Sequence, residues 1–212
     1  MVNTALAIFV KTPVRSPLKT RLGASVGEQK ALEFYTRSIA AIAETVKKSD
    51  VSPYWAVAEH DALNDEIWNA FATLHTGEGC LGTRQYNIYE TLLKNHDQAI
   101  LIGADAPQLS PAIISQTITA LKNNEHVIGP ANDGGYYLFA GKSSIPLDIW
   151  TNTPWSAENT RIQFIENLEK TPYELPPLTD IDTQQDLAAL KSEMPNPMNA
   201  HQKALMDWIK IL

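Results

Sequence analysis

Short apolar segments alternate with segments of helical periodicity along this chain, and this alternation restricts its fold more than any other feature. The clearest apolar run, Ala99–Gly103, has polar flanks and predicts a buried strand. Ser110 and Pro111 follow as a helix N-cap and a proline at the first helical position, so we expect a helix that ends near Lys122. Apolar residues at helical spacing predict a longer helix over 28–48.

The rest of the chain continues the same alternation. We expect further strands over 6–10, 54–58, 72–75, 127–129 and 136–140, and further helices over 61–70, 83–94, 157–169 and 183–191. The strand over 136–140 follows two adjacent glycines and is expected to pair antiparallel with a neighbour. Strands that alternate with helices predict an α/β fold in which a largely parallel sheet is covered on both faces.

The length of 212 residues suits one large domain with a small addition. We expect a main domain over 1–193 and a C-terminal helical extension over 194–212, separated by a Pro-Asn-Pro hinge at 195–197. The extension carries an apolar stripe made of Ala204, Leu205, Trp208, Ile209 and Leu212. Such a stripe must be covered, either by its own domain or by a second subunit in a homodimer.

Composition excludes several classes of function. The net charge of −7 argues against duplex nucleic acid as a partner, because phosphate contacts need a broad basic face. Cys80 is the only cysteine, so no intrachain disulfide forms, and a reducing compartment fits. No apolar run approaches the length of a membrane span. We therefore expect a cytoplasmic protein that has no membrane span and no nucleic-acid partner.

Basic residues are concentrated in one short segment after the first expected strand. Residues 1–27 contain no Asp or Glu, and their four cations are Lys11, Arg15, Lys19 and Arg21. An acidic protein that gathers unopposed cations at a strand end is expected to hold an anion there. The alternative is a solvated basic surface loop.

Aspartates mark two other places where chemistry is expected. Asp105 follows the strand 99–103, where open α/β sheets place their ligand crevice, and its carboxylate suits Mg²⁺. Asp180 and Asp182 could join Asp105 around the same ion. Each position also has a purely structural interpretation, because Asp-X-Pro is common in turns and Asp182 before Thr183 resembles a helix N-cap.

Two glycine-containing segments complete the set of candidates. Asp133-Gly134-Gly135 lets a backbone lie flat against a substrate, although the same residues also form a simple hairpin turn. Residues 77–84 form a glycine-punctuated loop that opens a helix, and helix N-termini bind anions readily. The five histidines show no spacing typical of a zinc site, and there is no Walker loop.

The order of these motifs is more informative than any single one. A Lys-Thr-Arg-Leu segment is followed by Gly-Glu-Gly-x-Leu-Gly-x-Arg, Gly-x-Asp-x-Pro-x-Leu, Gly-Pro-x-x-Asp-Gly-Gly-Tyr-Tyr-Leu and Asp-x-Asp-Thr-x-x-Asp-Leu. Over about residues 5–190 the chain resembles the bacterial radical-SAM- and selenodomain-associated transferase family, which is often labelled glycosyltransferase. It is also similar to phospholactate guanylyltransferases. The resemblance implies the nucleotide-diphospho-sugar transferase superfamily and its GT-A fold, a three-layer α/β/α sandwich with a mostly parallel central sheet, here with a C-terminal helix.

The resemblance also implies roles for individual residues. A catalytic set would comprise Lys19, Arg21, Asp105 and Asp133. Nucleotide-binding residues would be Lys11, Lys19, Arg21, Gly79, Gly82 and Arg84, with Arg15 as an added donor because relatives carry Pro-Gly where this chain has Arg15-Ser16. Acceptor-binding residues would be Gly134, Gly135, Tyr136 and Trp155. Asp105, Asp182 and, with less support, Asp180 would bind Mg²⁺ or Mn²⁺.

Two reactions fit this pattern, and both need a nucleotide donor and a small acceptor. In nucleotidyl transfer a phosphate or hydroxyl acceptor attacks an NTP and pyrophosphate leaves. In glycosyl transfer the acceptor attacks the sugar carbon of an NDP-sugar. The cations of the basic segment favour nucleotidyl transfer, because they could neutralise the departing pyrophosphate, and we expect Lys19 and Arg21 to be exposed for that purpose. A third alternative is a nucleotide sensor that has lost turnover.

Overall fold

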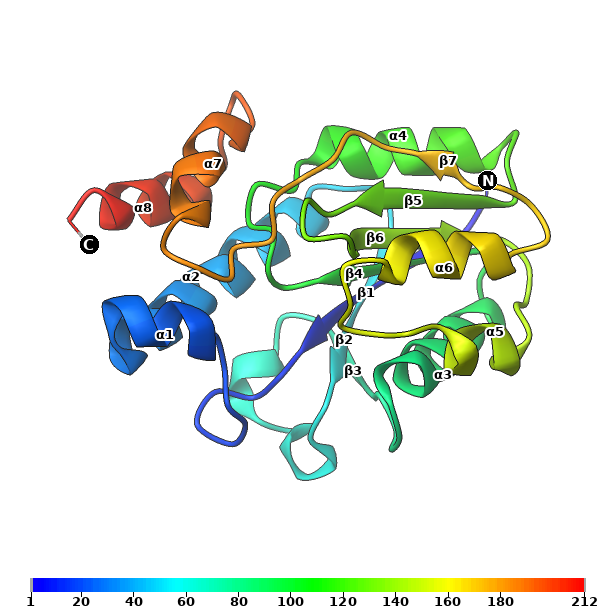
Figure 1. The fold of residues 1–212 in the computed structure, drawn as a ribbon, viewed down its shortest axis with the longest axis horizontal. Helices are drawn as coiled ribbons and strands as arrows, with labels where there is room; N and C mark the ends of the chain where they lie inside the picture. Colours follow the sequence, from blue (N-terminus) through cyan, green and yellow to red (C-terminus); the bar gives the residue numbers. More distant parts are fainter. Residues whose placement is uncertain (1, 212) are drawn as a thin grey trace.

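The computed structural model describes residues 2–211 and shows an α/β fold with one seven-stranded sheet in the order β3-β2-β1-β4-β6-β5-β7 (Figure 1). The pairs β1–β2, β1–β4, β2–β3 and β5–β7 are parallel, whereas β6 is antiparallel to both β4 and β5. The strands are β1 Thr4–Val10, β2 Ser52–Val57, β3 Ala72–His75, β4 Gln98–Gly103, β5 His126–Pro130, β6 Tyr136–Gly141 and β7 Tyr173–Glu174. The predicted fold class, including the antiparallel strand, is confirmed.

Helices cover both faces of this sheet. On one face, α2 and α4 pack Ile42 and Ile114 against strand residues such as Ile8 and Ile100. On the other face, α3, α5 and α6 bury an aromatic core against β4 and β6. The helices are α1 Thr20–Val26, α2 Glu28–Lys47, α3 Leu81–Leu93, α4 Pro111–Leu121, α5 Leu147–Asn152, α6 Thr160–Asn167, α7 Asp186–Glu193 and α8 Ala200–Ile209. The result is a three-layer α/β/α arrangement.

The structure differs from the sequence-based prediction in two connecting segments, and it adds helix α5 and strand β7, which were not predicted. Residues 61–70 do not form one helix, since the chain makes two separate 3₁₀ turns at His60–Ala62 and Glu66–Trp68. The chain from Thr20 to Val26, which includes the cation Arg21, forms the short helix α1, where we expected only a loop. Its seven residues are too few for an independent helix, so tertiary packing must hold it. Leu22 provides that packing, because it is fully buried against Ile181 and the C-terminal helices.

The terminal helix α8 lies along α2 within the same chain. Leu205 and Ile209 of its apolar stripe are buried, whereas Leu212 lies outside the described residues. Polar contacts fix the start of the helix: the Asn199 amide donates to Ala41 O at 3.0 Å, and the Gln202 amide donates to Pro107 O at 2.9 Å. These contacts tie the C-terminal segment to α2 and to the turn that follows β4.

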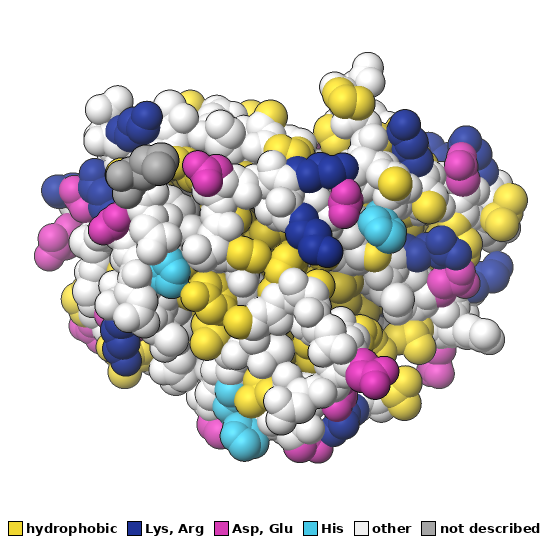
Figure 2. Space-filling view, turned by 180° about the vertical axis from the view of Figure 1, so that it is seen from behind, with side chains coloured by type: hydrophobic (Ala, Val, Ile, Leu, Met, Phe, Trp, Pro, Cys, Tyr) yellow, Lys and Arg dark blue, Asp and Glu magenta, His cyan; other side chains and the backbone are white. Residues whose placement is uncertain are grey.

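Charged side chains are mixed on the back of the molecule. On the face seen in Figure 2, Lys and Arg side chains are interspersed with Asp and Glu side chains, and apolar side chains gather between them. Within residues 2–211, no helix is long and apolar enough to cross a membrane.

Candidate functional site

A pocket of about 1140 Å³ opens at the C-terminal ends of β1 and β4. Its lining combines the segment before α1, the N-terminal turn of α3, the turn between β5 and β6, the segment 155–160 and the aspartates that precede α7. The carboxyl ends of strands in open α/β sheets are where such folds bind ligands. The volume slightly exceeds that of a typical site for one small molecule.

Four aspartates from three separate parts of the chain line this pocket. Asp105 follows β4, Asp133 lies in the β5–β6 turn, and Asp180 and Asp182 precede α7. The backbone joins two of these segments, because Ile181 N donates to Asp105 O at 3.1 Å. Ser38 of α2 fixes the backbone just before Asp105, since its hydroxyl donates to Ala104 O at 2.6 Å. The structure therefore brings together aspartates that the sequence placed far apart.

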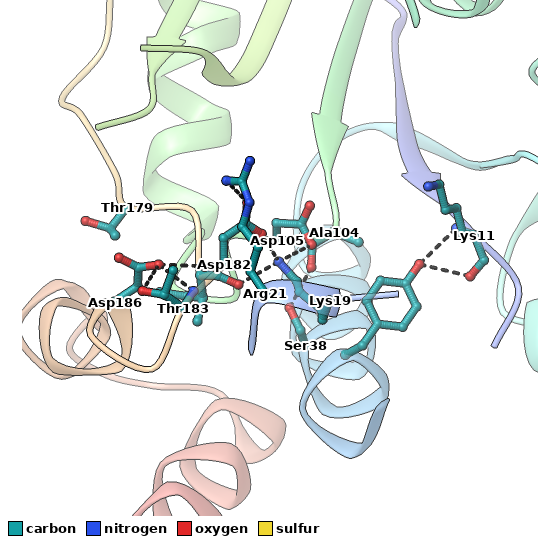
Figure 3. Close-up of polar contacts among 12 residues, drawn as sticks. Lys11, Lys19, Arg21, Ser38, Ala104, Asp105, Thr179, Asp182, Thr183 and Asp186 are labelled. Carbon is teal, nitrogen blue, oxygen red and sulfur yellow. Dashed lines mark hydrogen bonds and ion pairs between the residues drawn. The ribbon is translucent and has the colours of Figure 1, made fainter. Parts of the chain in front are cut away.

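Lys19 lies among these aspartates (Figure 3). Its Nζ is 2.7 Å from Asp105 Oδ1 and 2.9 Å from Asp182 Oδ1, and it donates to Ile181 O at 2.6 Å. Only 4% of the side chain is exposed, so the expectation of an exposed lysine was wrong. Burial alone would lower the pKa of Lys19, but the carboxylates of Asp105 and Asp182 outweigh burial and raise it. Lys19 is therefore a charged ammonium that binds carboxylates in this structure.

Arg21 occupies a different environment from Lys19. Its side chain is 76% exposed, as expected, and its Nη1 lies 3.8 Å from Asp182 Oδ2 at the edge of the pocket. Lys11 also lines the pocket, and no ion pair joins its side chain to any residue of the described part of the chain. Tyr35 fixes the Lys11 backbone, because its hydroxyl accepts from Lys11 N and donates to Lys11 O, both at 2.9 Å.

Arg15 points away from the pocket, contrary to the role we expected for it. Its guanidinium binds Asp61 at 2.6 Å and Asp65 at 3.1 Å in the segment of 3₁₀ turns. Glu59 holds the same loop, because its carboxylate accepts from Thr12 N at 2.8 Å and from the Ser16 hydroxyl. The loop is thus fastened to the 59–65 segment, and Arg15 does not line the pocket.

The predicted nucleotide contacts at the start of α3 divide into two groups. Arg84 lines the pocket, and its Nε donates to Gly79 O at 3.1 Å. Gly79 and Gly82 do not line it. Gly82 instead lets α3 approach α5, because a Cβ at this position would lie 2.1 Å from Trp150 O. This glycine therefore serves helix packing in the structure.

The residues predicted to bind the acceptor form one wall of the pocket. Asp133, Gly134, Gly135, Tyr136 and Trp155 all line it. The Tyr136 hydroxyl donates to Gln85 Oε1 at 2.7 Å, and its ring meets the Trp155 ring edge-on with centroids 6.0 Å apart. Asp133 stabilises its own turn, because its carboxylate accepts from Gly135 N at 2.9 Å. An aromatic surface next to acidic and backbone polar groups suits a small polar ligand.

Asp180 is the aspartate of the cluster whose ionisation is disfavoured, although Lys19 acts in the other direction. Burial, together with the negative charges of Asp105 and Asp133, raises the pKa of Asp180 to about 8. Within residues 2–211, no three His, Cys, Asp or Glu side chains are placed to hold a metal ion by themselves. Mg²⁺, however, commonly takes one or two carboxylates and completes its shell with substrate phosphates and water. Asp105 with Asp180 or Asp182 fits that kind of site.

Three contributors to the site were not identified from the sequence. Tyr35 and Ser38 lie on the buried face of α2, where helical spacing indicates core packing and gives no sign of a polar role. Glu59 follows β2 in an acidic segment that matches no recognised motif. Each acts on the backbone of a neighbouring segment, and contacts of that kind leave no local sequence pattern.

Comparison with known proteins gives a family and a fold. Residues 41–157, more than half of the chain, match the model of a family described as an uncharacterized protein conserved in bacteria (DUF2064). A proposed nucleotide-diphospho-sugar transferase from Desulfovibrio desulfuricans G20 superposes with a TM-score of 0.84 at 23% identity, covering 99% of each chain. No curated protein matches.

Two more distant structures share the fold and contain ligands. CMP:2-keto-3-deoxy-manno-octonic acid synthetase in complex with CTP superposes with a TM-score of 0.56 at 12% identity, covering 90% of this chain and 97% of that one. Rv0371C from Mycobacterium tuberculosis H37Rv in complex with manganese has a TM-score of 0.50 at 11% identity, covering 90% and 98%. The chain described here belongs to the DUF2064 family and has the fold of the nucleotide-diphospho-sugar transferase superfamily.

Proposed function

We propose that this protein is a metal-dependent transferase that uses a nucleotide donor, with nucleotidyl transfer from an NTP as its reaction. One observation carries the proposal: carboxylates and cations from distant segments surround a single pocket at the carboxyl ends of β1 and β4. Both charge types are needed there, because phosphates bind cations directly and bind carboxylates only through a divalent metal. The CTP complex of a protein with the same fold supports this choice of donor.

The metal, Mg²⁺ or Mn²⁺, would be held by Asp105 together with Asp182 or Asp180. A bound divalent cation supplies positive charge that stabilises phosphate oxygens as a bond to phosphorus breaks. The manganese complex of a protein with this fold supports such a site. Burial and the neighbouring carboxylates raise the pKa of Asp180 to about 8, and an added cation would stabilise its charged form.

The remaining residues divide into a donor side and an acceptor side. Lys11 and Arg21 are the cations placed to bind donor phosphates, and Arg84 faces the pocket from the start of α3. Tyr136 and Trp155 would pack against the acceptor, and Asp133 would orient its reacting group. In nucleotidyl transfer the acceptor oxygen forms a bond to the α-phosphorus, the bond to the bridging oxygen breaks, and pyrophosphate leaves toward the Lys11 and Arg21 side.

One observation favours glycosyl transfer as the second candidate. Of the four cations near the first strand, Arg15 is paired with Asp61 and Lys19 is paired with Asp105. Fewer cations therefore remain for a departing pyrophosphate than the sequence suggested. A departing NDP held by the metal needs fewer of them.

Ligand binding provides the first test of the proposal. Thermal unfolding is measured with NTPs and NDP-sugars, each with and without Mg²⁺ or Mn²⁺, and a bound ligand should raise the Tm only when metal is present. Asp105→Asn should abolish that metal dependence, whereas Asp148→Asn, in the first turn of α5 away from the pocket, should retain it. Retention of the metal dependence by Asp105→Asn would overturn the metal assignment.

Product analysis separates the two reactions. Phosphorylated and hydroxyl-bearing acceptors are incubated with the donor that binds, and ³¹P NMR identifies the phosphorus product. Pyrophosphate release from an NTP supports nucleotidyl transfer, and NDP release from a sugar nucleotide supports the second candidate. Metal-dependent nucleotide binding without either product from any acceptor would instead favour the sensor.

A further inference from the structure

The ammonium group of Lys19 has used all of its hydrogen-bonding capacity. A lysine ammonium has three N–H donors. In this structure its three partners are Asp105 Oδ1, Asp182 Oδ1 and Ile181 O, at 2.6 to 2.9 Å. No donor is left for a phosphate, although the sequence pattern had suggested one. The same two carboxylates are the ones proposed to bind the metal.

The fold around Lys19 holds it in this position. Its backbone has φ 47° and ψ 42°, a left-handed conformation that non-glycine residues seldom adopt. Helix α1 starts immediately afterwards and is anchored by Leu22, which packs against Ile181. The segments that carry Lys19 and Asp182 are therefore held together through a small apolar core as well as through the ion pair.

We propose that Lys19 is a built-in cation that competes with the divalent metal for Asp105 and Asp182, so that the metal binds together with the nucleotide and only weakly before it. The inference rests on the proposed function, because it assumes that these carboxylates are metal ligands. An ammonium and a divalent cation on the same two carboxylates lie close together and repel each other.

The phosphates of the donor remove this conflict. When the nucleotide arrives with its metal, its oxygens are acceptors that can replace the carboxylates as partners of the Lys19 ammonium. The exchange keeps every charge paired: the carboxylates change partner from ammonium to metal, and the ammonium changes partner from carboxylate to phosphate. Without the nucleotide, release of Lys19 would leave a mostly buried ammonium without partners, which is unfavourable. Lys19 is therefore a positioning residue for the empty site and a phosphate-binding residue for the loaded one.

Titration of the nucleotide-free protein with Mn²⁺ tests the competition. Electron paramagnetic resonance measures the free Mn²⁺ and hence the Kd. Lys19→Met removes the charge and keeps an unbranched side chain, so the variant should bind Mn²⁺ about tenfold more tightly than the wild type or better, because a repelling charge next to the metal is gone. Lys48→Met, which removes one positive charge from an exposed position at the end of α2, should leave the Kd unchanged.

Lys19→Arg keeps a cation at this position and is the second variant. It should bind Mn²⁺ as weakly as the wild type, which also covers the case in which Lys19→Met does not fold. An unchanged or weaker Mn²⁺ affinity in folded Lys19→Met, or a tightened one in Lys19→Arg, would overturn the competition. A failure of the proposed function would be recognised by a different result, namely that Asp105→Asn retains metal-dependent nucleotide binding.

Discussion

The hydroxyl of Tyr35 binds both backbone polar groups of Lys11, accepting from its N–H and donating to its carbonyl, each at 2.9 Å. Lys11 is the first residue after β1, at the point where the chain enters the pocket. A side chain of α2 thus sets the direction in which the chain leaves the first strand. Burial raises the pKa of the Tyr35 phenol, so the hydroxyl stays protonated and can donate this hydrogen bond.

Tyr35→Phe should weaken nucleotide binding. The substitution keeps the ring in the core but leaves the N–H and the carbonyl of Lys11 without their partner, so the segment that carries this lysine becomes less well fixed. We expect a loss of about 1 to 3 kcal/mol in the free energy of unfolding, measured with urea. We also expect a higher Kd for the metal–nucleotide complex, measured by isothermal titration calorimetry.

Tyr89→Phe is the matched control for this prediction. Tyr89 is also a buried tyrosine whose hydroxyl donates to a backbone carbonyl, that of Ser143 at 2.8 Å, but it does not line the pocket. This variant should lose stability and keep its nucleotide affinity. Equal effects of the two substitutions on the Kd would show that Tyr35 acts only through general stability.

Gly82→Ala should disturb the packing of α3 against α5. A Cβ at this position would lie 2.1 Å from Trp150 O and 2.3 Å from Trp155 Nε1, so the helices must separate. Overpacking of this kind costs about 1 to 3 kcal/mol of stability. Denaturant unfolding measures the loss, and near-ultraviolet circular dichroism should report the change around the two tryptophans.

Gly23→Ala in helix α1 gives the opposite expectation. Its Cβ would meet nothing closer than 3.6 Å, and the residue is helical. Alanine in a helix is favoured over glycine by about 0.5 to 1 kcal/mol, so this variant should be as stable as the wild type or more stable. A destabilised Gly23→Ala would show that α1 does not form the helix described here.

The strand–helix alternation was sufficient to predict the fold, because each buried strand is marked by its own apolar run. Ala99–Gly103 became the central strand β4, and Asp105 lies at its carboxyl end as the pattern required. These features depend on short segments of sequence and on general rules of sheet architecture. Asp182 reaches the same place through a contact between distant segments, the hydrogen bond from Ile181 N to Asp105 O.

The partners of individual cations could not be predicted, because they depend on where distant segments meet. Arg15 turns to Asp61 since residues 59–68 form two 3₁₀ turns instead of one helix. Lys19 is buried because α1 packs through Leu22 on a core that includes Ile181. A count of positive charges along the sequence therefore overestimated the number available to a ligand.

Glu59→Ala should release the loop between β1 and α1. The Glu59 carboxylate accepts hydrogen bonds from Thr12 N and from the Ser16 hydroxyl, and these bonds lower its pKa although burial acts in the other direction. Without the carboxylate, the Thr12 amide should exchange with deuterium faster, which mass spectrometry can measure. Glu66→Ala, on the exposed side of the neighbouring 3₁₀ turn, should leave this exchange rate unchanged.

His126→Phe should reduce the sensitivity of the protein to mild acid. His126 is 6% exposed at the start of β5, where it stacks on Phe139 with centroids 5.8 Å apart, and burial lowers its pKa below the usual value. As the pH falls below about 6.5, His126 takes up a proton in the unfolded chain but not in the folded one. The free energy of unfolding therefore decreases with pH, until the pH passes the lower pKa that His126 has in the folded state. Phenylalanine keeps the aromatic stack and does not titrate. Urea unfolding between pH 5 and pH 7 should therefore show a smaller loss of stability in the variant than in the wild type. Carboxylates that do not interact with His126 contribute equally to both proteins, and His201→Gln, at an exposed site on α8, should follow the wild-type pH dependence. Identical pH profiles for His126→Phe and the wild type would mean that His126 takes up its proton as readily in the folded chain as in the unfolded one.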